Sequence, residues 1–281
     1  MKRRFSRRGN ALPLALILLG SVGLAVCFLR ALPTLSERLT AAQVYDTLQR
    51  EAVTVQARSP EPTTLPQTVS NRAEADVPAV TPIPEQIRLC RAQSVDFDAL
   101  LAINADTIGW LCCTNTEIDY PVVYSADNAY YLSHLIDGTK NRNGTLFVDK
   151  RNSRTFSDRN TVLYGHCMKS GKMFGKLANF ASQRYFDAHP VFFLYTPSGA
   201  YCVELFAAYT TRSDSFAYTF VFDDDASFLS FLEEARACSA VENDVMPNAH
   251  DRILTLSTCA YAFAGARFVL QGRLIPLDGS A

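Results

Sequence analysis

A run of nineteen uncharged residues, from Ala11 to Leu29, is the feature that most limits what this chain can fold into. A helix rises about 1.5 Å per residue, so the run has the length needed to cross the roughly 30 Å hydrocarbon core of a bilayer. Five basic residues precede the run, and only Arg30 follows it closely. The positive-inside rule then predicts a cytoplasmic tail at residues 1–10, a single-pass membrane anchor at 11–29 and an extracellular remainder.

Two other kinds of N-terminal segment fit this run less well. A cleaved signal peptide usually has an apolar core of about 7–15 residues, and no small-x-small cleavage site follows Leu29. A lipoprotein would be modified at Cys27, but the bulky Val26 stands where a small residue is expected. The uncleaved anchor is therefore the preferred interpretation.

The charge balance argues against a protein that binds nucleic acid. The whole chain carries 27 Lys and Arg against 28 Asp and Glu, a formal net charge of −1. Nucleic-acid binders that work by bulk charge show a basic excess. Here the basic excess is confined to the first thirty residues, and the rest of the chain is mildly acidic.

A stalk separates the predicted anchor from one folded domain. Residues 34–56 have helical spacing of apolar residues, and residues 58–84 hold six of the thirteen prolines without an aromatic residue or a glycine. Such a segment cannot bury a core and is typical of a semi-rigid spacer. The sequence therefore predicts an extracellular stalk at residues 30–84 and a folded domain at 85–281.

Most of the folded domain has strand patterns. Six runs rich in β-branched and aromatic residues, bounded by Gly, Pro, Asn or Asp, predict strands. They lie at residues 145–149, 161–164, 191–195, 201–206, 253–256 and 267–271. Helices are predicted at residues 83–101, 128–136 and 225–238, the last behind aspartates that favour a helix N-terminus. Many short strands with few helices predict a mostly β domain built as a closed barrel.

Cys259 and His166 are the candidate catalytic residues. Cys259 follows the strand at 253–256 and Arg267 opens the next strand, so pairing of these strands would bring a guanidinium near the thiol. His166 follows the strand at 161–164, where it can serve as general acid or base. The alternatives are a cysteine that fills a core and a histidine that makes structural hydrogen bonds. No Cys-x-x-Cys pair or zinc-like spacing occurs, so neither a metal nor another cofactor is predicted.

A series of stretches in the folded domain resembles the class B sortases. In chain order they are Ile108-Gly-Trp-Leu111, Thr116-Glu-Ile-Asp-Tyr-Pro-Val-Val123, Asp127-Asn-Ala-Tyr-Tyr-Leu132, Gly144-Thr-Leu-Phe-Val-Asp149 with Arg151-Asn152, Asn160-Thr-Val-Leu-Tyr-Gly-His166, the following Cys167-Met-Lys-Ser-Gly-Lys-Met-Phe174, and Thr255-Leu-Ser-Thr-Cys259 with Arg267. The likeness covers about residues 97–275, in order and without large gaps.

This resemblance implies a closed barrel of about eight strands, with an N-terminal helix and a helix inserted before the cysteine strand. It also implies a membrane-anchored cysteine transpeptidase that cleaves the C-terminal sorting signal of secreted proteins after threonine. Cys259 is then the nucleophile that forms a thioester, His166 the general acid and base, and Arg267 the residue that stabilises substrate and oxyanion. The acyl group passes to an amine of a peptidoglycan precursor, and no metal takes part.

By the same resemblance, Asn128, Leu132 and Ser257 match positions that line the substrate groove. Their alternative roles are a helix cap, a core leucine and a strand-end hydroxyl. Other functions compete with cell-wall anchoring: a cysteine peptidase on the same scaffold, a polymerising sortase of the pilin type, and a surface adhesin without activity. The adhesin is disfavoured because a binding module has no need of all three catalytic residues.

Overall fold

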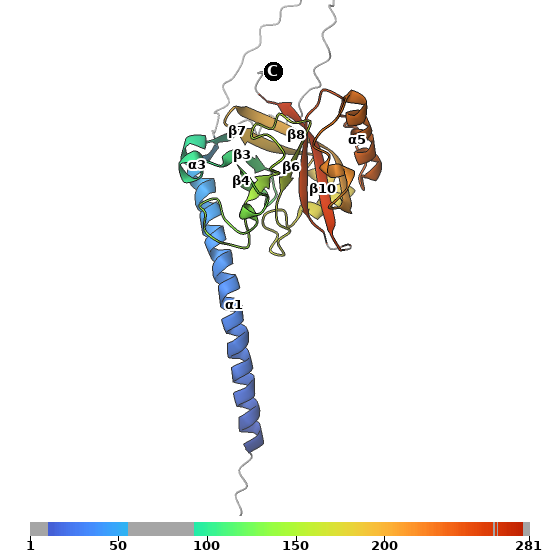
Figure 1. Ribbon diagram of the computed structural model, residues 1–281. Coiled ribbons are helices and arrows are strands. Elements are labelled where there is room, and N and C mark those ends of the chain that lie inside the picture. Colours follow the sequence, from blue (N-terminus) through green and yellow to red (C-terminus); the bar gives the residue numbers. More distant parts are fainter. Residues whose placement is uncertain (1–10, 56–92, 261, 263, 278–281) are drawn as a thin grey trace, which may run out of the picture. The chain divides into compact units, whose positions relative to one another are not determined.

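The computed structural model describes residues 11–55, 93–260, 262 and 264–277 of the chain (Figure 1). The chain forms two compact units, Met1–Val44 and Tyr45–Ala281. The predicted basic tail at 1–10 lies outside the described residues, as do the side chains of residues 11–26. The predicted boundary between stalk and domain at residue 84 falls in the undescribed segment 56–92.

The first helix, α1, runs without interruption from Ala11 to Ala52 and contains Pro33. It joins into one helix the two segments that the sequence separates, an anchor at 11–29 and a stalk helix at 34–56. Among the described residues, no helix has both the length and the apolarity needed to span a membrane. The membrane anchor and its orientation stay predictions.

The last turns of α1 belong to the second unit and are buried in it. The Tyr45 hydroxyl donates a hydrogen bond of 2.6 Å to the carbonyl of Gly144, and the Tyr45 ring meets the Tyr120 ring edge-on at 5.2 Å. Leu48 and Ala52 are buried as well. Strand β1 (Val53–Val55) follows directly and pairs antiparallel with β2 (Gln93–Val95). The packed part of the second unit therefore begins before the Pro-rich segment.

We expect the variant Tyr45→Phe to lower the free energy of unfolding by about 1–2 kcal/mol, because it leaves the buried Gly144 carbonyl without this donor. Denaturant unfolding of the full-length protein measures the loss. Tyr201→Phe is the matched control, since the described contact of Tyr201, with Arg252, is made by its ring. Equal stability of Tyr45→Phe and the unchanged protein would contradict the prediction.

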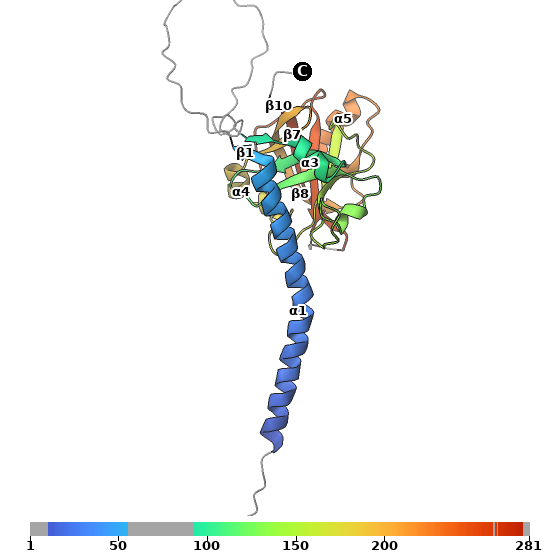
Figure 2. The same cartoon turned by 90° about the vertical axis from the view of Figure 1, so that its left-hand side faces the viewer.

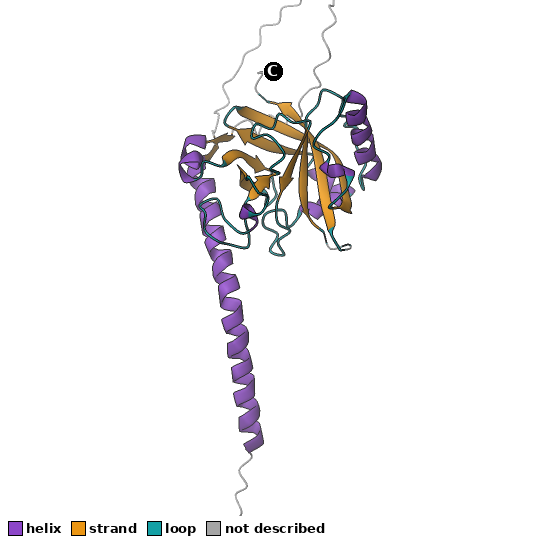
Figure 3. Ribbon diagram, viewed as in Figure 1, coloured by secondary structure: helices purple, strands orange, loops and turns teal. Residues whose placement is uncertain are grey.

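Eight strands close into a barrel, as Figure 3 shows in orange. They are β3 (Thr107–Cys112), β4 (Asp119–Tyr124), β5 (Leu146–Val148), β6 (Asn160–Tyr164), β7 (Val191–Thr196), β8 (Gly199–Arg212), β9 (Ile253–Cys259) and β10 (Ala266–Pro276). Their order around the barrel is β10-β8-β7-β3-β4-β5-β6-β9, and the pairing of β9 with β10 closes it. The pairs β4–β5 and β6–β9 are parallel, and the other pairs are antiparallel.

Short helices fill the connections between the strands. They are α3 (Phe97–Ile103), α4 (Gln183–Ala188), α5 (Asp225–Cys238) and the 3₁₀ turns at Tyr130–Leu132, Leu177–Ala181 and Phe216–Tyr218. Figures 1 and 2 place α3 and α5 on opposite flanks of the barrel. The fold matches the expected mostly β barrel with a helix inserted before the cysteine strand.

Helix α5 forms where the sequence predicts it, because both its cap and its apolar face are encoded locally. The Asp224 side chain accepts a hydrogen bond of 2.8 Å from the backbone N–H of Ser227, which caps the first turn. Phe228, Phe231 and Leu232 are buried on one face and pack against the outside of the barrel. The long connection between β8 and β9 is thereby held in place.

One predicted helix is wrong, and a second is present only in part. Residues 128–136 form only a 3₁₀ turn, Tyr130–Leu132, because His134 pairs its backbone with Lys140 and leaves the helical path. Of the helix predicted at 83–101, residues 83–92 lie outside the described residues and 93–95 form strand β2. Residues 97–101 are helical as predicted, in α3, which starts after the Asp96 cap. In both places backbone pairing overrides the helical pattern, within one loop at His134 and with the distant strand β1 at residues 93–95.

Candidate active site

Cys259 and Arg267 face each other across the pair of strands that closes the barrel. Cys259 is the last residue of β9 and Arg267 the second of β10, and the antiparallel register makes them direct partners. Cβ atoms of such partners lie about 4.5–5.5 Å apart. The thiol is exposed and the guanidinium half-buried, so both groups are open to a bound molecule.

His166 is brought to the same end of the barrel by β6, which runs parallel to β9. Strand β6 ends with Tyr164 opposite Ser257. The Gly165 N–H then donates to the Ser257 carbonyl at 3.2 Å, and the Thr258 hydroxyl donates to the Gly165 carbonyl at 2.7 Å. These bonds fix the backbone just before His166, which lies two residues beyond the end of β6, the strand next to the cysteine strand.

Gly165 is required by close packing. A Cβ atom at this position would lie 2.5 Å from the Leu146 side chain and 2.6 Å from the Phe174 ring. Any larger residue would therefore push the segment that carries His166 away from the barrel. The glycine before the histidine in the sequence motif is explained by this contact.

The imidazole of His166 is held by a backbone carbonyl. Its Nε2 lies 2.7 Å from the carbonyl oxygen of Leu132, at the end of the 3₁₀ turn. A carbonyl only accepts hydrogen bonds, so Nε2 carries a hydrogen and donates it. The bond orients the ring and leaves Nδ1 as the nitrogen that can exchange a proton.

A pocket of about 420 Å³ joins these groups. All six residues that the sequence singles out line it: Asn128, Leu132, His166, Ser257, Cys259 and Arg267. Six further lining residues had not been assigned to the pocket: Phe147, Tyr164, Gly165, Ser213, Tyr218 and Thr258. Four of them, Phe147, Tyr164, Gly165 and Thr258, lie within motifs already quoted, whereas Ser213 and Tyr218 lie in segments that carry no motif.

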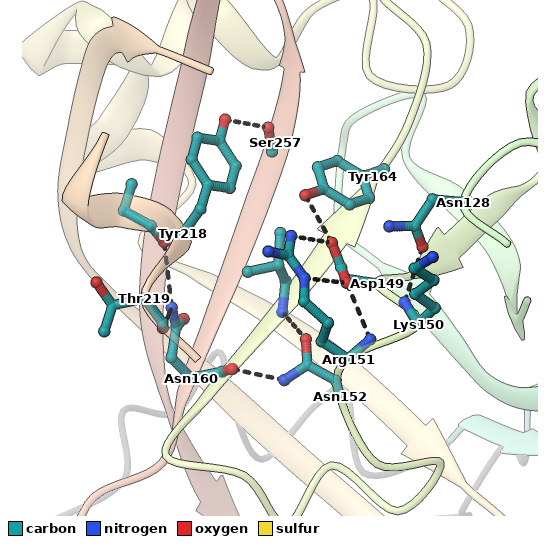
Figure 4. A network of polar contacts seen from close by, with 12 residues as sticks. Asn128, Asp149, Lys150, Arg151, Asn152, Asn160, Tyr164, Tyr218, Thr219 and Ser257 are labelled. Atoms are coloured by element: carbon teal, nitrogen blue, oxygen red, sulfur yellow. Dashed lines mark hydrogen bonds and ion pairs between the residues drawn. The ribbon is translucent and has the colours of Figure 1, made fainter. Parts of the chain in front are cut away.

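Asn128 and Leu132 have surroundings that differ from their alternative roles, whereas Ser257 lies near the end of β9, as its alternative role requires. Asn128 has a φ of 53°, a left-handed conformation that asparagine tolerates, and its Oδ1 accepts a 2.7 Å hydrogen bond from the Lys150 N–H. Leu132 is 41% exposed rather than a core leucine. The buried Ser257 hydroxyl bonds to that of Tyr218 at 2.8 Å (Figure 4).

Burial keeps the Tyr218 hydroxyl neutral. Burial raises the pKa of the Tyr218 hydroxyl, and the Cys259 thiolate raises it further, while the Ser257 hydrogen bond and the Arg267 charge oppose the shift. The net direction is upward, so the phenol remains a hydrogen-bond donor at neutral pH. Arg267 and Cys259 act on the pKa of Tyr218 in opposite directions.

Two of the three remaining histidines have structural side-chain contacts outside the pocket. His134 stacks on the Tyr130 ring at 4.0 Å, and His189 bonds the Tyr185 carbonyl through Nδ1 at 2.9 Å. Neither lines the pocket. Within the described ranges, no three His, Cys, Asp or Glu side chains gather closely enough to hold a metal ion.

Cys167 is a second thiol close to the candidate nucleophile. Its pKa is raised from the ordinary value, first by burial and then by the negative charge of Cys259. A raised thiol pKa means that the thiolate forms only at higher pH. We therefore expect iodoacetamide to alkylate Cys167 slowly at pH 7 and faster as the pH rises toward 10.

Mass mapping of the alkylated peptides over a pH series measures how the alkylation rate of Cys167 depends on pH. Cys238, an exposed thiol on α5, is the internal control for reagent access. Alkylation of Cys167 that is as fast at pH 7 as at pH 10 would contradict the raised pKa of this thiol.

Comparison with known proteins places this arrangement among the sortases. No family model matches the chain. Sortase B of Listeria monocytogenes is 39% identical over 178 residues, which are 63% of this chain and 72% of that protein. Sortase B of Staphylococcus aureus is 34% identical over 185 residues, 65% of this chain and 75% of that protein.

Solved structures agree with these relatives. A Staphylococcus aureus sortase B–substrate complex superposes with a TM-score of 0.62 at 31% identity, covering 65% of this chain and 86% of that chain. A sortase B complexed with triglycine superposes with the same values. The predicted fold, a closed sortase-type barrel of eight strands, is confirmed.

Proposed function

Because this chain belongs to the sortase B family of cysteine transpeptidases, we propose that Cys259, His166 and Arg267 carry out its transpeptidation in the 420 Å³ pocket. The observation that carries the proposal is that one pocket is lined by a thiol, an imidazole and a guanidinium, each delivered by the end of a different strand. A nucleophile, a proton carrier and a fixed positive charge are the groups that acyl transfer needs.

In the proposed first step, the Cys259 thiolate attacks the carbonyl carbon of a threonine in a sorting signal. The C–N bond of the signal breaks, the acyl group stays on sulfur as a thioester, and the departing amine takes a proton from His166. Arg267, opposite the cysteine on β10, stabilises the oxygen that becomes negative during the attack. The acyl group is thereby stored in a bond that an amine can displace.

In the second step, an amine attacks the thioester carbon and gives a proton back to His166. The bond from Nε2 to the Leu132 carbonyl supports Nδ1 as the nitrogen that carries this proton in both steps. The C–S bond breaks, Cys259 returns as a thiolate, and a new amide links the protein to the acceptor. An exposed thiol on the protein surface is compatible with the entry of two separate substrates.

The proposed substrates are secreted proteins with a C-terminal sorting signal and an amine of a peptidoglycan precursor. One sortase B has been solved as a substrate complex and one with triglycine, which supports a peptide and an amine as the two ligand classes here. Asn128, Leu132 and Ser257 are proposed to contact the signal from the pocket wall. No metal or other cofactor enters the proposed reaction.

We further propose that residues 11–29 anchor the protein in the cell membrane, with residues 1–10 in the cytoplasm and the catalytic domain, 85–281, outside. The support is the uncharged run behind five basic residues. Cell fractionation tests the anchor, and protease added to intact cells tests the orientation. Recovery of the full-length protein in the soluble fraction would refute the anchor.

The alternatives differ in where the acyl group goes. A peptidase on this scaffold would pass it to water, and a pilin-type sortase would pass it to a lysine of another subunit. Both reactions pass through the same thioester. The presence of Cys259, His166 and Arg267 therefore does not distinguish them from cell-wall anchoring.

The test uses the full-length protein in detergent with quenched peptides carrying Asn-Pro-x-Thr-x and related signals, with and without triglycine. We expect an acyl adduct on Cys259 and, with triglycine, a ligated product detected by mass spectrometry. Cleavage without ligation at saturating triglycine would favour the peptidase. Ligation to a lysine peptide in preference to triglycine would favour the polymerising enzyme.

A further inference from the structure

Asp149 is a fully buried carboxylate at the edge of the pocket wall. It follows β5 directly, and its side chain is 0% exposed. Removing a carboxylate from water costs several kcal/mol unless charged and polar partners compensate. Asp149 lies outside the catalytic set, but it has such partners, and these partners connect it to the pocket.

The partners of Asp149 come from its own loop and from β6. Arg151 donates to both carboxylate oxygens, from Nε at 2.9 Å and from a terminal nitrogen at 2.8 Å, and its backbone N–H donates at 2.9 Å. The Tyr164 hydroxyl donates at 3.0 Å (Figure 4). Although burial alone would raise the pKa of Asp149, these hydrogen bonds hold it below the ordinary value, so the group is charged at neutral pH.

Tyr164 and Asn128 connect this carboxylate to the pocket. Both line the pocket together with Cys259. The Tyr164 hydroxyl points toward Asp149, and the backbone N–H of Lys150, the residue after Asp149, donates to the side-chain oxygen of Asn128 (Figure 4). A single loop, 149–151, therefore fixes two pocket-lining side chains.

Arg151, the ion-pair partner of Asp149, also contacts the segment that carries Tyr218. Its guanidinium lies 3.8 Å from the centre of the Phe220 ring, two residues beyond the pocket-lining Tyr218. The Tyr164 and Tyr218 rings stand nearly parallel, at 19°, with their centres 6.4 Å apart. Asp149 thus stands behind one of two facing tyrosines, and its ion-pair partner packs beside the segment that carries the other.

Stability alone is a weak reason to bury this ion pair, because apolar residues of similar size often stabilise a core as well or better. A buried, fully bonded carboxylate instead fixes the orientation of its partner. Asp149 accepts a hydrogen bond from the Tyr164 hydroxyl only when the phenol ring stands in one position. Binding sites depend on such support behind the residues that contact the ligand.

We propose that Asp149 is a positioning residue for recognition of the sorting signal, holding the Tyr164 ring in the orientation that binds the peptide. The proposal rests on the proposed function, since it assumes that this pocket receives the signal. Asp149 touches neither the substrate nor the reacting atoms. Its loss therefore weakens peptide binding without changing the intrinsic reactivity of Cys259.

The test compares Asp149→Asn, Tyr164→Phe and the double variant in the full-length protein. We expect each single variant to lower kcat/KM for the best sorting peptide about tenfold, mainly by raising KM, as loss of one charge-assisted hydrogen bond predicts. In the Tyr164→Phe background, Asp149→Asn should cost less than it does alone, because the shared bond is already gone. Alkylation of Cys259 by iodoacetamide should proceed at the unchanged rate in all three.

Glu204→Gln is the matched control. Glu204 makes a similar two-point ion pair with Arg273, at 2.6 and 2.7 Å, and is not among the pocket residues. We expect it to leave KM unchanged. Strictly additive losses in the double variant, or an unchanged KM in folded Asp149→Asn, would overturn the proposal. If Asp149→Asn does not fold, an unchanged KM in Tyr164→Phe overturns it instead.

A crystal structure of Asp149→Asn separates this proposal from the proposed function. We expect the Tyr164 ring to leave its present position or to show two positions. An unmoved ring, with its hydroxyl bonded to the introduced amide at the same distance, would overturn the positioning role whether or not the enzyme turns over. Conversely, absence of any acyl adduct in the unchanged protein would count against the proposed function alone.

Discussion

Replacing Cys259 with alanine is expected to abolish acyl-enzyme formation and ligation while leaving the barrel folded. Loss of the nucleophile in enzymes of this type lowers turnover by about 10⁴-fold or more, because no other group can form the covalent intermediate. The Cys259 side chain is exposed at the end of β9, so its truncation removes little buried surface. The unfolding temperature should therefore stay close to that of the unchanged protein.

The measurement is intact-mass spectrometry after incubation with the sorting peptide, followed by product analysis with triglycine. Cys238→Ala is the control, since it removes another exposed thiol, on α5, that does not line the pocket. It should retain full activity. An acyl adduct that persists in Cys259→Ala, for example on Cys167, would transfer the nucleophile role to another residue.

The sequence is informative about this site because the chemistry sits in contiguous motifs. Cys259 and His166 each follow a strand whose β-branched and apolar residues are visible locally. Pairing of the cysteine strand with the next one, which the sequence raises as a condition, is present in the structure and makes Cys259 and Arg267 direct partners. The α5 helix is predictable for the same reason, since its cap and its apolar face lie within one segment.

Other parts depend on contacts between distant segments. The parallel pairing of β6 with β9, which brings His166 beside the cysteine strand, leaves no signal in either strand alone. Tyr218 enters the pocket because Asn160, fully buried on β6, donates to the carbonyls of Ala217 and Thr219 on both sides of it. No pattern around Tyr218 reveals these bonds, so its place in the pocket could not be predicted from the sequence.

The second large effect is expected from Arg267→Gln, which should lower kcat/KM by about 10²–10³-fold, the usual cost of losing a group that stabilises an oxyanion. Glutamine keeps a polar side chain but removes the positive charge. The half-buried Arg267 is the direct partner of Cys259 in the strand register, and its charge reaches Tyr218 across the pocket. A fixed charge in this place acts on negative charge that develops near sulfur.

Single-turnover acylation distinguishes the two ways in which Arg267 can act. If it stabilises the oxyanion, Arg267→Gln slows the acylation step at saturating peptide, whereas a residue that only binds the signal raises the peptide concentration needed for half-maximal rate. We expect the first result, with partial recovery in Arg267→Lys, because lysine restores the charge without the planar guanidinium. Arg273→Gln, on the same strand but paired with Glu204, is the control and should acylate normally. Equal acylation rates in Arg267→Gln and the control would remove Arg267 from the catalytic set and leave Cys259 and His166 to act without a fixed positive charge.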